Sequence, residues 1–398
     1  MNRKLIVTRT DDCILTALFE NDEITELHCC QDSACDNQPA LGNIYVGKVK
    51  NIVNNIGAAF IEIADGIECY YALDENPKPI FTNKIGKKPL CIGDELLVQV
   101  SKEAVKTKAP TVNSKLNFTG KYVILTSGDT RIGVSSKLEQ TERARLQSIA
   151  STYASEQYGF IIRTNAKDMD EELLKQELER LIGEYESLIR TAATRVCFSC
   201  LKAAQKPYLT ELRNIYQEGL TDIIVEDTGL YNEIKAYLEE KQPEDLEKLR
   251  LYEDRQLPLH KLYSLEKHMA DALKERVWLK SGAYLVIQPT EALTVIDVNT
   301  GKCVDKKKDD KTYLKINLEA AKETARQIRL RNLSGIIVVD FINLTEPAYM
   351  EKLLETFGRE LQKDPITTSL VDITKLQLVE VTRKKVRKPL HETIGGLK

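Results

Sequence analysis

The sequence predicts a multidomain protein that combines α/β and α+β layers. Its 398 residues are more than one hydrophobic core usually serves, so two or more modules are expected. Between residues 4 and 104, short strand-like runs are separated by turn residues, whereas residues 276–398 alternate apolar strands with long helical periods. Such a change along the chain is typical of domains with different layer architectures.

The opening segment, residues 4–30, has the pattern of three short strands with Asp and Asn residues in the turns. Residues 221–254 give a strand, a helix and a second strand, which are expected to complete an α/β layer begun by the first segment. Between them, residues 42–108 hold the β-type runs IYVGKVKNIV, AAFIEIA, ECYYAL and ELLVQVSKEA. These short runs predict a small antiparallel barrel, inserted into that layer.

A long amphipathic helix is predicted over residues 169–196, after the strand-like runs KYVILTS and GFIIRT. Its apolar stripe consists of Leu173, Leu174, Leu178, Leu181 and Ile182. A scaffold or interdomain role is the simplest interpretation. After residue 276, strands at 283–290, 292–301 and 335–341 alternate with helices at 311–332 and 345–362, and a strand-rich pair follows. Apolar strands in this order predict a mostly parallel sheet that is covered on its faces.

Composition excludes several classes of protein. The formal net charge of -3 gives no global attraction to polyanions. The N-terminus has no signal-peptide pattern and no later run reaches membrane-spanning length, so a cytoplasmic location is expected. Nine cysteines without a secretory signal favour reduced thiols over a disulfide framework. Cys197 and Cys200 have metal-like spacing but lack a second pair, and Cys29, Cys30 and Cys35 have only His28 nearby, so zinc is not expected.

Two aspartates end predicted neighbouring strands of the C-terminal layer. Asp297 follows LTVI and Asp340 follows GIIVV, and functional groups of α/β layers collect at such strand ends. Two carboxylates brought together there favour a hard cation such as Mg²⁺ between them. Asn299 faces the same side of an extended segment and is a candidate for orienting a bound water. The structural alternative is that both aspartates are helix caps or turn formers.

Clusters of basic and aromatic residues are candidates for binding a nucleic acid. Arg326, Arg329 and Arg331 lie on the helix between the two aspartates, and TRKKVRK follows near the end. A solvated charged face is the alternative interpretation. In the barrel, aromatic rings lie near lysines on strand-like runs, as in barrels that stack on unpaired bases, although some of the rings must be core. The barrel candidates are Phe60, Tyr70 and Tyr71, with Lys48, Lys50, Lys102, Lys106 and Lys108.

Read together, these segments resemble the RNase E/G family over essentially the full length. The blocks EALTVIDVNTG, NLEAAKETARQIRLRNLSGIIVVDFI and ITKLQLVEVTRKKVR resemble the family's catalytic blocks in order and spacing. GNIYVGKVKNIVNNIGAAFIEI resembles the opening of its S1-type barrel, and GFIIRT resembles the segment that recognises a 5′ end. The resemblance implies an RNase H-like fold split by insertion. The implied domains are 1–38 (RNase H-like, first part), 39–118 (S1-type OB fold), 119–208 (5′-sensor region), 209–275 (RNase H-like, second part) and 276–398 (DNase I-like catalytic region).

The same resemblance implies roles for individual residues. Asp297 and Asp340 would hold Mg²⁺, or Mn²⁺ in its place, with support from Asn299. The reaction would be endonucleolytic hydrolysis of single-stranded RNA, in mRNA decay or rRNA and tRNA processing, leaving 5′-phosphate and 3′-hydroxyl ends. The resemblance also implies binding residues, which are Arg163, Thr164, Gly120 and Ile124 for a 5′-monophosphate, and Phe60, Tyr70 and Lys108 for RNA in the barrel.

The sequence departs from the family pattern in three places. The CPxC zinc-link and the small domain that follow the catalytic region in relatives are absent, so no structural zinc and a monomer or zinc-independent homodimer are expected. Asn343 stands where many relatives have Asp, and Thr367 stands where a basic residue often supports the 5′ pocket. These changes weaken the expectation of strong 5′-monophosphate dependence. A catalytically silent RNA-binding regulator with the same fold is the alternative, and the presence of both aspartates favours the enzyme.

Overall fold

The computed structural model describes residues 2–10, 13–31, 39–104, 109–215, 219–254, 256–302 and 309–395. The chain divides into two compact units. Unit 1 comprises Met1–Ala34 and Asn214–Lys398, and unit 2 comprises Cys35–Arg213. Among the described residues, no helix is long and apolar enough to span a membrane. Each unit is a mixture of helices and sheets, as the sequence predicts.

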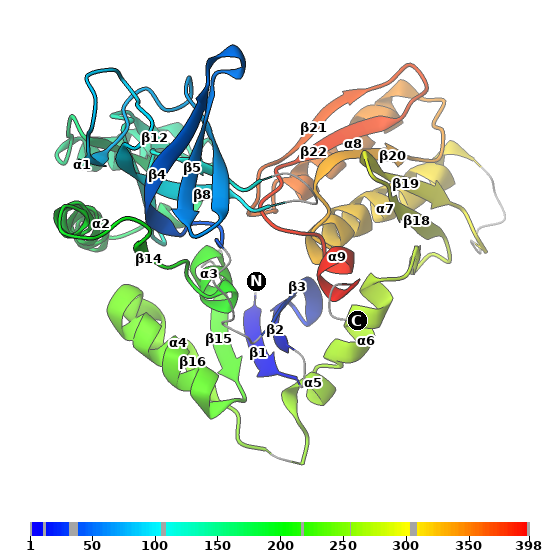
Figure 1. The fold of residues 1–398 in the computed structure, drawn as a ribbon. Coiled ribbons are helices and arrows are strands. Elements are labelled where there is room, and N and C mark those ends of the chain that lie inside the picture. Colours follow the sequence, from blue (N-terminus) through cyan, green and yellow to red (C-terminus); the bar gives the residue numbers. More distant parts are fainter. Residues whose placement is uncertain are drawn as a thin grey trace. The chain divides into compact units, whose positions relative to one another are not determined.

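The first sheet of unit 1 joins the two ends of a long insertion. Its strands, in the order β16-β15-β1-β2-β3, are β16 (Leu249–Leu251), β15 (Leu220–Val225), β1 (Arg3–Arg9), β2 (Cys13–Glu20) and β3 (Glu23–Gln31). Strands β1 to β3 form the predicted antiparallel meander, and β1 pairs with β15 in parallel. Figure 1 shows these blue strands beside the green β15 and β16. The expected completion of one layer by two distant segments is therefore confirmed.

Short helices accompany this first sheet. They are α4 (Thr228–Lys241), the 3-10 helix η3 (Pro243–Lys248), α5 (Leu259–Leu262) and α6 (Leu265–Ala272). Helix α4 begins after Asp227, whose side chain accepts a hydrogen bond from the backbone N–H of Leu230 at 2.8 Å. The β2–β3 turn has Asn21 and Asp22 at φ 48° and 66°, the left-handed conformation that a two-residue hairpin turn requires.

The second sheet of unit 1 carries the two candidate aspartates. Its order is β17 (Arg276–Trp278), β18 (Tyr284–Pro289), β19 (Leu293–Asn299), β20 (Gly335–Asp340), β22 (Val379–Arg383) and β21 (Thr368–Ile373). Helices α7 (Asp310–Leu330) and α8 (Pro347–Leu361) pack against it, whereas α9 (Leu390–Gly395) contacts β3 of the first sheet. Helix α7 is the crossover between β19 and β20, and these two strands pair in parallel.

The prediction of a mostly parallel, covered sheet is wrong for these six strands. The pairings of β17 with β18, β18 with β19, β20 with β22 and β21 with β22 are all antiparallel. The β17–β18, β18–β19 and β21–β22 connections are short, and short connections join antiparallel neighbours. One face packs on α7 and α8 through buried residues such as Ile296, Val339 and Phe357, whereas the other face is open.

Unit 2 contains a closed barrel of five strands. They are β4 (Ile44–Val53), β5 (Ala58–Ala64), β6 (Ile67–Ala72), β9 (Thr111–Asn113) and β8 (Glu95–Lys102), and β4 pairs with β8 to close the ring. This closure is consistent with an OB-type fold. A Cβ added at Gly47 would lie 2.6 Å from Cγ2 of Ile61, so only glycine fits there. The additional elements are β7 (Phe81–Asn83), β14 (Cys200–Lys202) and the 3-10 helix η1 (Asn54–Ile56).

The second sheet of unit 2 has the order β10 (Asn117–Thr119), β11 (Val123–Ser127), β13 (Tyr158–Ile162) and β12 (Ile132–Val134). Its helical elements are α1 (Gln140–Ser151), α2 (Glu171–Ala192), α3 (Pro207–Asn214) and the 3-10 helix η2 (Thr164–Ala166). On α2, the predicted stripe residues Leu174, Leu178 and Leu181 are buried, so the amphipathic helix is confirmed. Cys200 lies in β14, which pairs with β4 far away in the chain.

Candidate active site

Asp340 is the last residue of β20, and Asp297 lies on β19 two residues before that strand ends, at the point where the parallel pairing of the two strands ends. The two aspartates are direct register partners, and their neighbours Ile296, Val298 and Val339 point into the core against α7 and α8. Because side chains alternate between the faces of a sheet, both carboxylates lie on the open face. Adjacent strands are about 4.8 Å apart, so the two side chains are close enough to share one cation. The predicted strand-end placement is therefore found for Asp340, whereas β19 continues two residues beyond Asp297.

The charges around the two carboxylates favour a cation. Burial and the nearby Asp297 carboxylate raise the pKa of Asp340 above its ordinary value. Within the described part of the chain, no lysine or arginine forms an ion pair with either aspartate. Two acidic groups placed together without a protein counter-charge fit a divalent ion with oxygen ligands. The helix-cap alternative is not supported, because the N-cap of α7 is Asp309 and the residue before α8 is Glu346.

Asn299 supports Asp297 directly. Its Nδ2 donates a hydrogen bond to Oδ2 of Asp297 at 2.6 Å. A carboxylate oxygen can only accept, so the amide nitrogen must face Asp297 and the amide oxygen points elsewhere. This hydrogen bond fixes one orientation of the carboxylate.

A buried asparagine on α7 positions the end of β20, and the sequence analysis did not identify it. The side chain of Asn317 is fully buried; its Nδ2 donates to the carbonyl of Ile342 at 2.7 Å and its Oδ1 accepts from the N–H of Ile342 at 3.0 Å. The backbone two residues beyond Asp340 is thereby tied to the helix. Asn317 could have been found from the sequence, because it is a polar residue within the apolar stripe of a predicted helix.

The aspartates lie on an exposed surface and do not line the cavity of unit 1. That cavity, of about 850 Å³, is lined by the β2–β3 turn, α6, β17 and α7, and neither Asp297 nor Asp340 contributes to it. An open face admits a long polymer whose ends need not enter a pocket.

Asn343, one of the departures from the family pattern, is exposed near Asp340, and Thr367 is exposed before β21.

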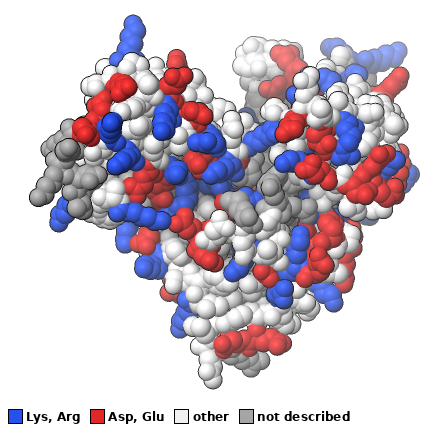
Figure 2. Space-filling view, turned by 180° about the vertical axis from the view of Figure 1, so that it is seen from behind, with Lys and Arg blue, Asp and Glu red and all other residues white. Residues whose placement is uncertain are grey.

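The α7 arginines do not form a phosphate-binding face or a solvated one. Arg329 is 6% exposed and forms ion pairs of 3.0 Å with Glu20 and Glu26. Arg326 pairs with Glu323 and donates to the carbonyl of Ile24. Arg331 is buried as well, with its Nε donating to Gln327. Arg326 and Arg329 therefore join α7 to the first sheet, whereas the hydrogen bond of Arg331 to Gln327 stays within its own helix. On the face drawn in Figure 2, basic and acidic side chains are interspersed.

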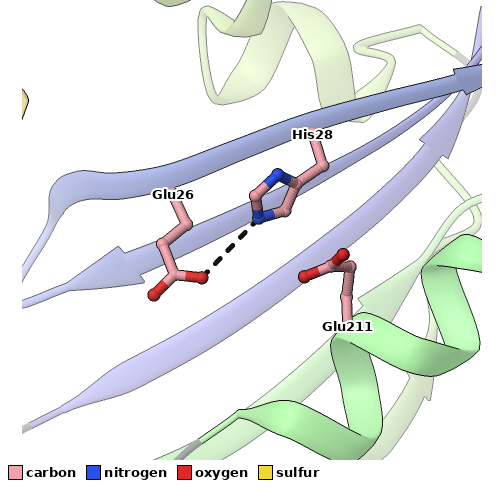
Figure 3. A group of neighbouring side chains, drawn as sticks. All are labelled: Glu26, His28 and Glu211. Atoms are coloured by element: carbon pink, nitrogen blue, oxygen red, sulfur yellow. Dashed lines mark ion pairs between the residues drawn. The ribbon is translucent and has the colours of Figure 1, made fainter. Parts of the chain in front are cut away.

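Glu26 and His28 lie side by side on β3 (Figure 3). His28 Nε2 is 3.6 Å from a carboxylate oxygen of Glu26. Burial, with the charge of Arg387, lowers the pKa of His28 to about 4, although Glu26 opposes this shift. His28 is therefore neutral at pH 7, and the contact becomes an ion pair only in acid. Glu211, also drawn in Figure 3, belongs to unit 2.

We expect His28 to make the protein less stable as the pH falls from about 6.5 to about 4. In that window the unfolded chain, with an ordinary histidine pKa of 6.5, binds a proton that the folded chain does not. The loss at pH 5 relative to pH 7 is about 2 kcal/mol. Urea unfolding at both pH values should show this difference in the wild type and a smaller one in His28→Gln. His391→Gln, on the exposed side of α9, is the control; an equal pH dependence in wild type and His28→Gln would contradict the assignment.

The barrel places two predicted aromatic residues side by side. Phe60 and Tyr70 are register partners on β5 and β6, half-buried, with ring centroids 6.4 Å apart in an edge-to-face arrangement. Tyr71 is fully buried and its hydroxyl is hydrogen-bonded to Ser114, so it belongs to the barrel core. Lys50 is exposed and paired with Glu62 at 3.0 Å. Lys106 and Lys108 lie outside the described residues.

The four residues predicted for 5′-end recognition meet at one end of the β11–β13 pair. Arg163 directly follows β13, and its Nη1 donates to the carbonyls of Gly120 at 2.8 Å and Lys121 at 3.3 Å. The hydroxyl of Thr164 is 2.8 Å from that of Ser135. Ile124 is half-buried on β11. Nearby, the buried carboxylate of Glu177 on α2 accepts from the N–H groups of three consecutive residues, each at 2.7 Å: Lys121, Tyr122 and Val123.

Comparison with known proteins finds relatives that match nearly the whole chain. The model of the ribonuclease E/G family matches residues 117–386, which include the two aspartates. The chain is 31% identical over 404 residues to ribonuclease G of Haemophilus influenzae, covering 98% of this chain and 81% of that protein. It is 32% identical over 409 residues to ribonuclease G of Escherichia coli K12, covering 99% and 82%. It is 31% identical over 389 residues to ribonuclease E of Nostoc sp., covering 96% and 56%.

Proposed function

The chain belongs to the ribonuclease E/G family and is an endoribonuclease, and we propose that it hydrolyses phosphodiester bonds in single-stranded RNA with Mg²⁺ as cofactor. One observation carries this proposal, namely the register pairing of Asp297 with Asp340 on an open sheet face. Asp297 and Asp340 would hold the ion, for which Mn²⁺ is a chemically similar substitute, and Asn299 would keep Asp297 in place. When bound, the ion activates water and stabilises negative charge at the phosphate.

The products follow from which bond breaks. Water adds to phosphorus and the bond to the 3′-oxygen breaks, so the upstream fragment keeps a 3′-hydroxyl and the downstream fragment keeps a 5′-phosphate. The leaving oxygen takes a proton from solvent. Asp297 and Asp340 act as ligands in this scheme, and Asn317 acts through the backbone of Ile342 to hold the end of β20.

We propose that the barrel binds the same RNA. Phe60 and Tyr70 offer half-buried rings to unpaired bases, and Lys108 is proposed to contact the backbone. The matching domain plan has RNase H-like parts at 1–38 and 209–275, an S1-type domain at 39–118, a 5′-sensor region at 119–208 and a DNase I-like catalytic region at 276–398. We further propose that the protein is cytoplasmic and acts in mRNA decay or in the processing of rRNA or tRNA. It is proposed to be a monomer or a zinc-independent homodimer.

Arg163 and Thr164, with the backbone around Gly120 and Ile124, are proposed to bind a 5′-monophosphate. We expect Arg163→Lys to lower the preference for 5′-phosphorylated over 5′-hydroxyl RNA, by up to about tenfold. The reason is that lysine keeps the charge but loses the fork of donors. The measurement is cleavage of one RNA carrying either end. Arg131→Lys is the matched control, since Arg131 is exposed and paired with Asp129. Equal cleavage of both RNAs by the wild type would refute 5′ sensing without touching the catalytic assignment.

The nuclease proposal is tested by cleavage of a fluorescent single-stranded RNA with and without Mg²⁺. We expect cleavage that requires the ion and products that carry 5′-phosphate and 3′-hydroxyl ends. Products with 2′,3′-cyclic phosphate, or full activity in EDTA, would refute the proposed chemistry.

A further inference from the structure

The open face of the six-stranded sheet is partly apolar and aromatic. Trp278 is 57% exposed and Ile336 is 55% exposed, and both lie on the face that α7 and α8 leave uncovered. The next residues in the sequence, Leu279 and Ile337, are buried. Large exposed apolar side chains grouped on one sheet face are uncommon on a soluble domain and mark a binding surface.

Three side chains at one edge of this face form an ordered group, the β17–β18 cluster of Arg276, Trp278 and Tyr284. Trp278 and Tyr284 are register partners with ring centroids 5.1 Å apart and a 57° angle between the rings. The guanidinium carbon of Arg276 lies 4.4 Å from the Tyr284 centroid and 5.9 Å from the Trp278 centroid. The cluster therefore presents aromatic surface and a positive charge together.

The cluster is continuous with the carboxylates across the sheet. Tyr284 is the register partner of Asn299, whose amide donates to Asp297. Asp297 is in turn the partner of Asp340. From β18 to β20 is two strand spacings, about 10 Å. Just after β19, Gly301 lies against the backbone of Gly282 and the ring of Tyr284. Only glycine fits there, because a Cβ would lie 2.4 Å from the carbonyl oxygen of Gly282 and 3.1 Å from Cδ1 of Tyr284.

We propose that the β17–β18 cluster binds the base of a nucleotide next to the scissile phosphate. This inference rests on the proposed nuclease function and adds a substrate subsite to it. Aromatic rings stack on any base, and an arginine beside them adds stacking and a contact to phosphate, so the subsite binds single-stranded RNA with little base preference. A protein partner fits less well, because the cluster shares its sheet face with two acidic groups suited to a cation and a phosphate.

The chain offers a direct reporter of this subsite, since Trp278 is its single tryptophan. We expect tryptophan fluorescence of the Asp297→Asn variant to be quenched when a short single-stranded RNA binds in Mg²⁺ buffer. An RNA with abasic sites at the nucleotides flanking its cleavage position should bind without this quenching. Unchanged fluorescence with the intact RNA at saturation would overturn the proposal.

Cleavage kinetics give a second, independent test. Trp278→Ala and Tyr284→Ala should each raise the KM for a single-stranded RNA about tenfold, whereas Trp278→Phe and Tyr284→Phe should retain most of the affinity. Tyr231→Ala, a half-buried tyrosine on α4, is the control and should match the wild type. If the wild type cleaves RNA but the alanine variants equal it, the subsite is refuted and the nuclease stands. If RNA quenches the fluorescence of Trp278 but the wild type does not cleave RNA, the subsite stands and the nuclease proposal is refuted.

Discussion

Replacing Asp297 by asparagine is expected to lower the rate of RNA cleavage by at least about 10³-fold, because a lost charged ligand removes several kcal/mol of stabilisation from the transition state. Asparagine has the same shape and can still accept the hydrogen bond from Asn299. Asp340→Asn should have an equal effect, since the two carboxylates share one proposed ion. Single-turnover cleavage measures the rate, and binding to the same RNA should change only slightly.

Asp271→Asn is the matched control for this experiment. Asp271 is an aspartate of the same unit, exposed on α6 and paired with Lys274 at 2.8 Å. Its replacement should leave cleavage at the wild-type rate. Wild-type cleavage by Asp297→Asn would place the chemistry elsewhere, whereas a large loss in Asp271→Asn would show that any lost carboxylate disturbs unit 1.

Replacing Arg383 by methionine is expected to destabilise unit 1 by about 3–5 kcal/mol, because it leaves a buried carboxylate without its counter-charge. Arg383 is 4% exposed, and its Nε lies 2.7 Å from Oδ2 of Asp364, which is itself 2% exposed. Its Nη1 also donates to Oδ1 of Asn332 at 2.6 Å and to the carbonyl of Leu333 at 3.0 Å. Methionine keeps the stem of the side chain but none of these contacts.

Denaturant unfolding followed by the fluorescence of Trp278 measures this loss in the sheet that contains Arg383. Lys384→Met is the control, because Lys384 is the exposed neighbour and should change stability by less than about 0.5 kcal/mol. The opposite pattern, stable protein with weakened RNA binding in Arg383→Met, would mean that this arginine contacts phosphate and is not structural.

The neighbouring position of the two aspartates could be predicted because few arrangements are compatible with the sequence. Two apolar runs, each ending in Asp and joined by one long helix, form a parallel pair, and this pairing brings Asp297 and Asp340 into register. The amphipathic stripe of α2 and the barrel strands followed equally from periodicity. Local patterns of this kind predict the structure correctly where the local preference agrees with the packing around it.

The uncovered face of the six-stranded sheet could not be predicted. Strand β19 has apolar residues on both faces, and Val295 on β19 and Ile336 on β20 are exposed although their runs have the pattern of fully buried strands. An apolar residue kept for a ligand is indistinguishable in sequence from one kept for a core. For the same reason Trp278 and Tyr284 gave no signal before their register was known.

The buried arginines had no sequence signature either. Helix α7 contacts β18 and β19 on one side and β3 on the other, so charged residues that an amphipathic pattern assigns to solvent are enclosed. Arg329 tolerates this because Glu20 and Glu26, about 300 positions earlier, provide its counter-charges. Contacts between such distant positions arise from the tertiary fold and not from local spacing.

The central claim is that Asp297 and Asp340 bind one divalent cation together. A titration of the full chain with Mn²⁺, followed by electron paramagnetic resonance of the free ion, measures this binding without any need for RNA or turnover. We predict that the wild type binds about one equivalent of Mn²⁺, and that Asp297→Asn and Asp340→Asn each bind this ion more weakly. Asp271→Asn should bind Mn²⁺ as the wild type does. Identical Mn²⁺ binding by the wild type and both carboxylate variants would contradict the shared site.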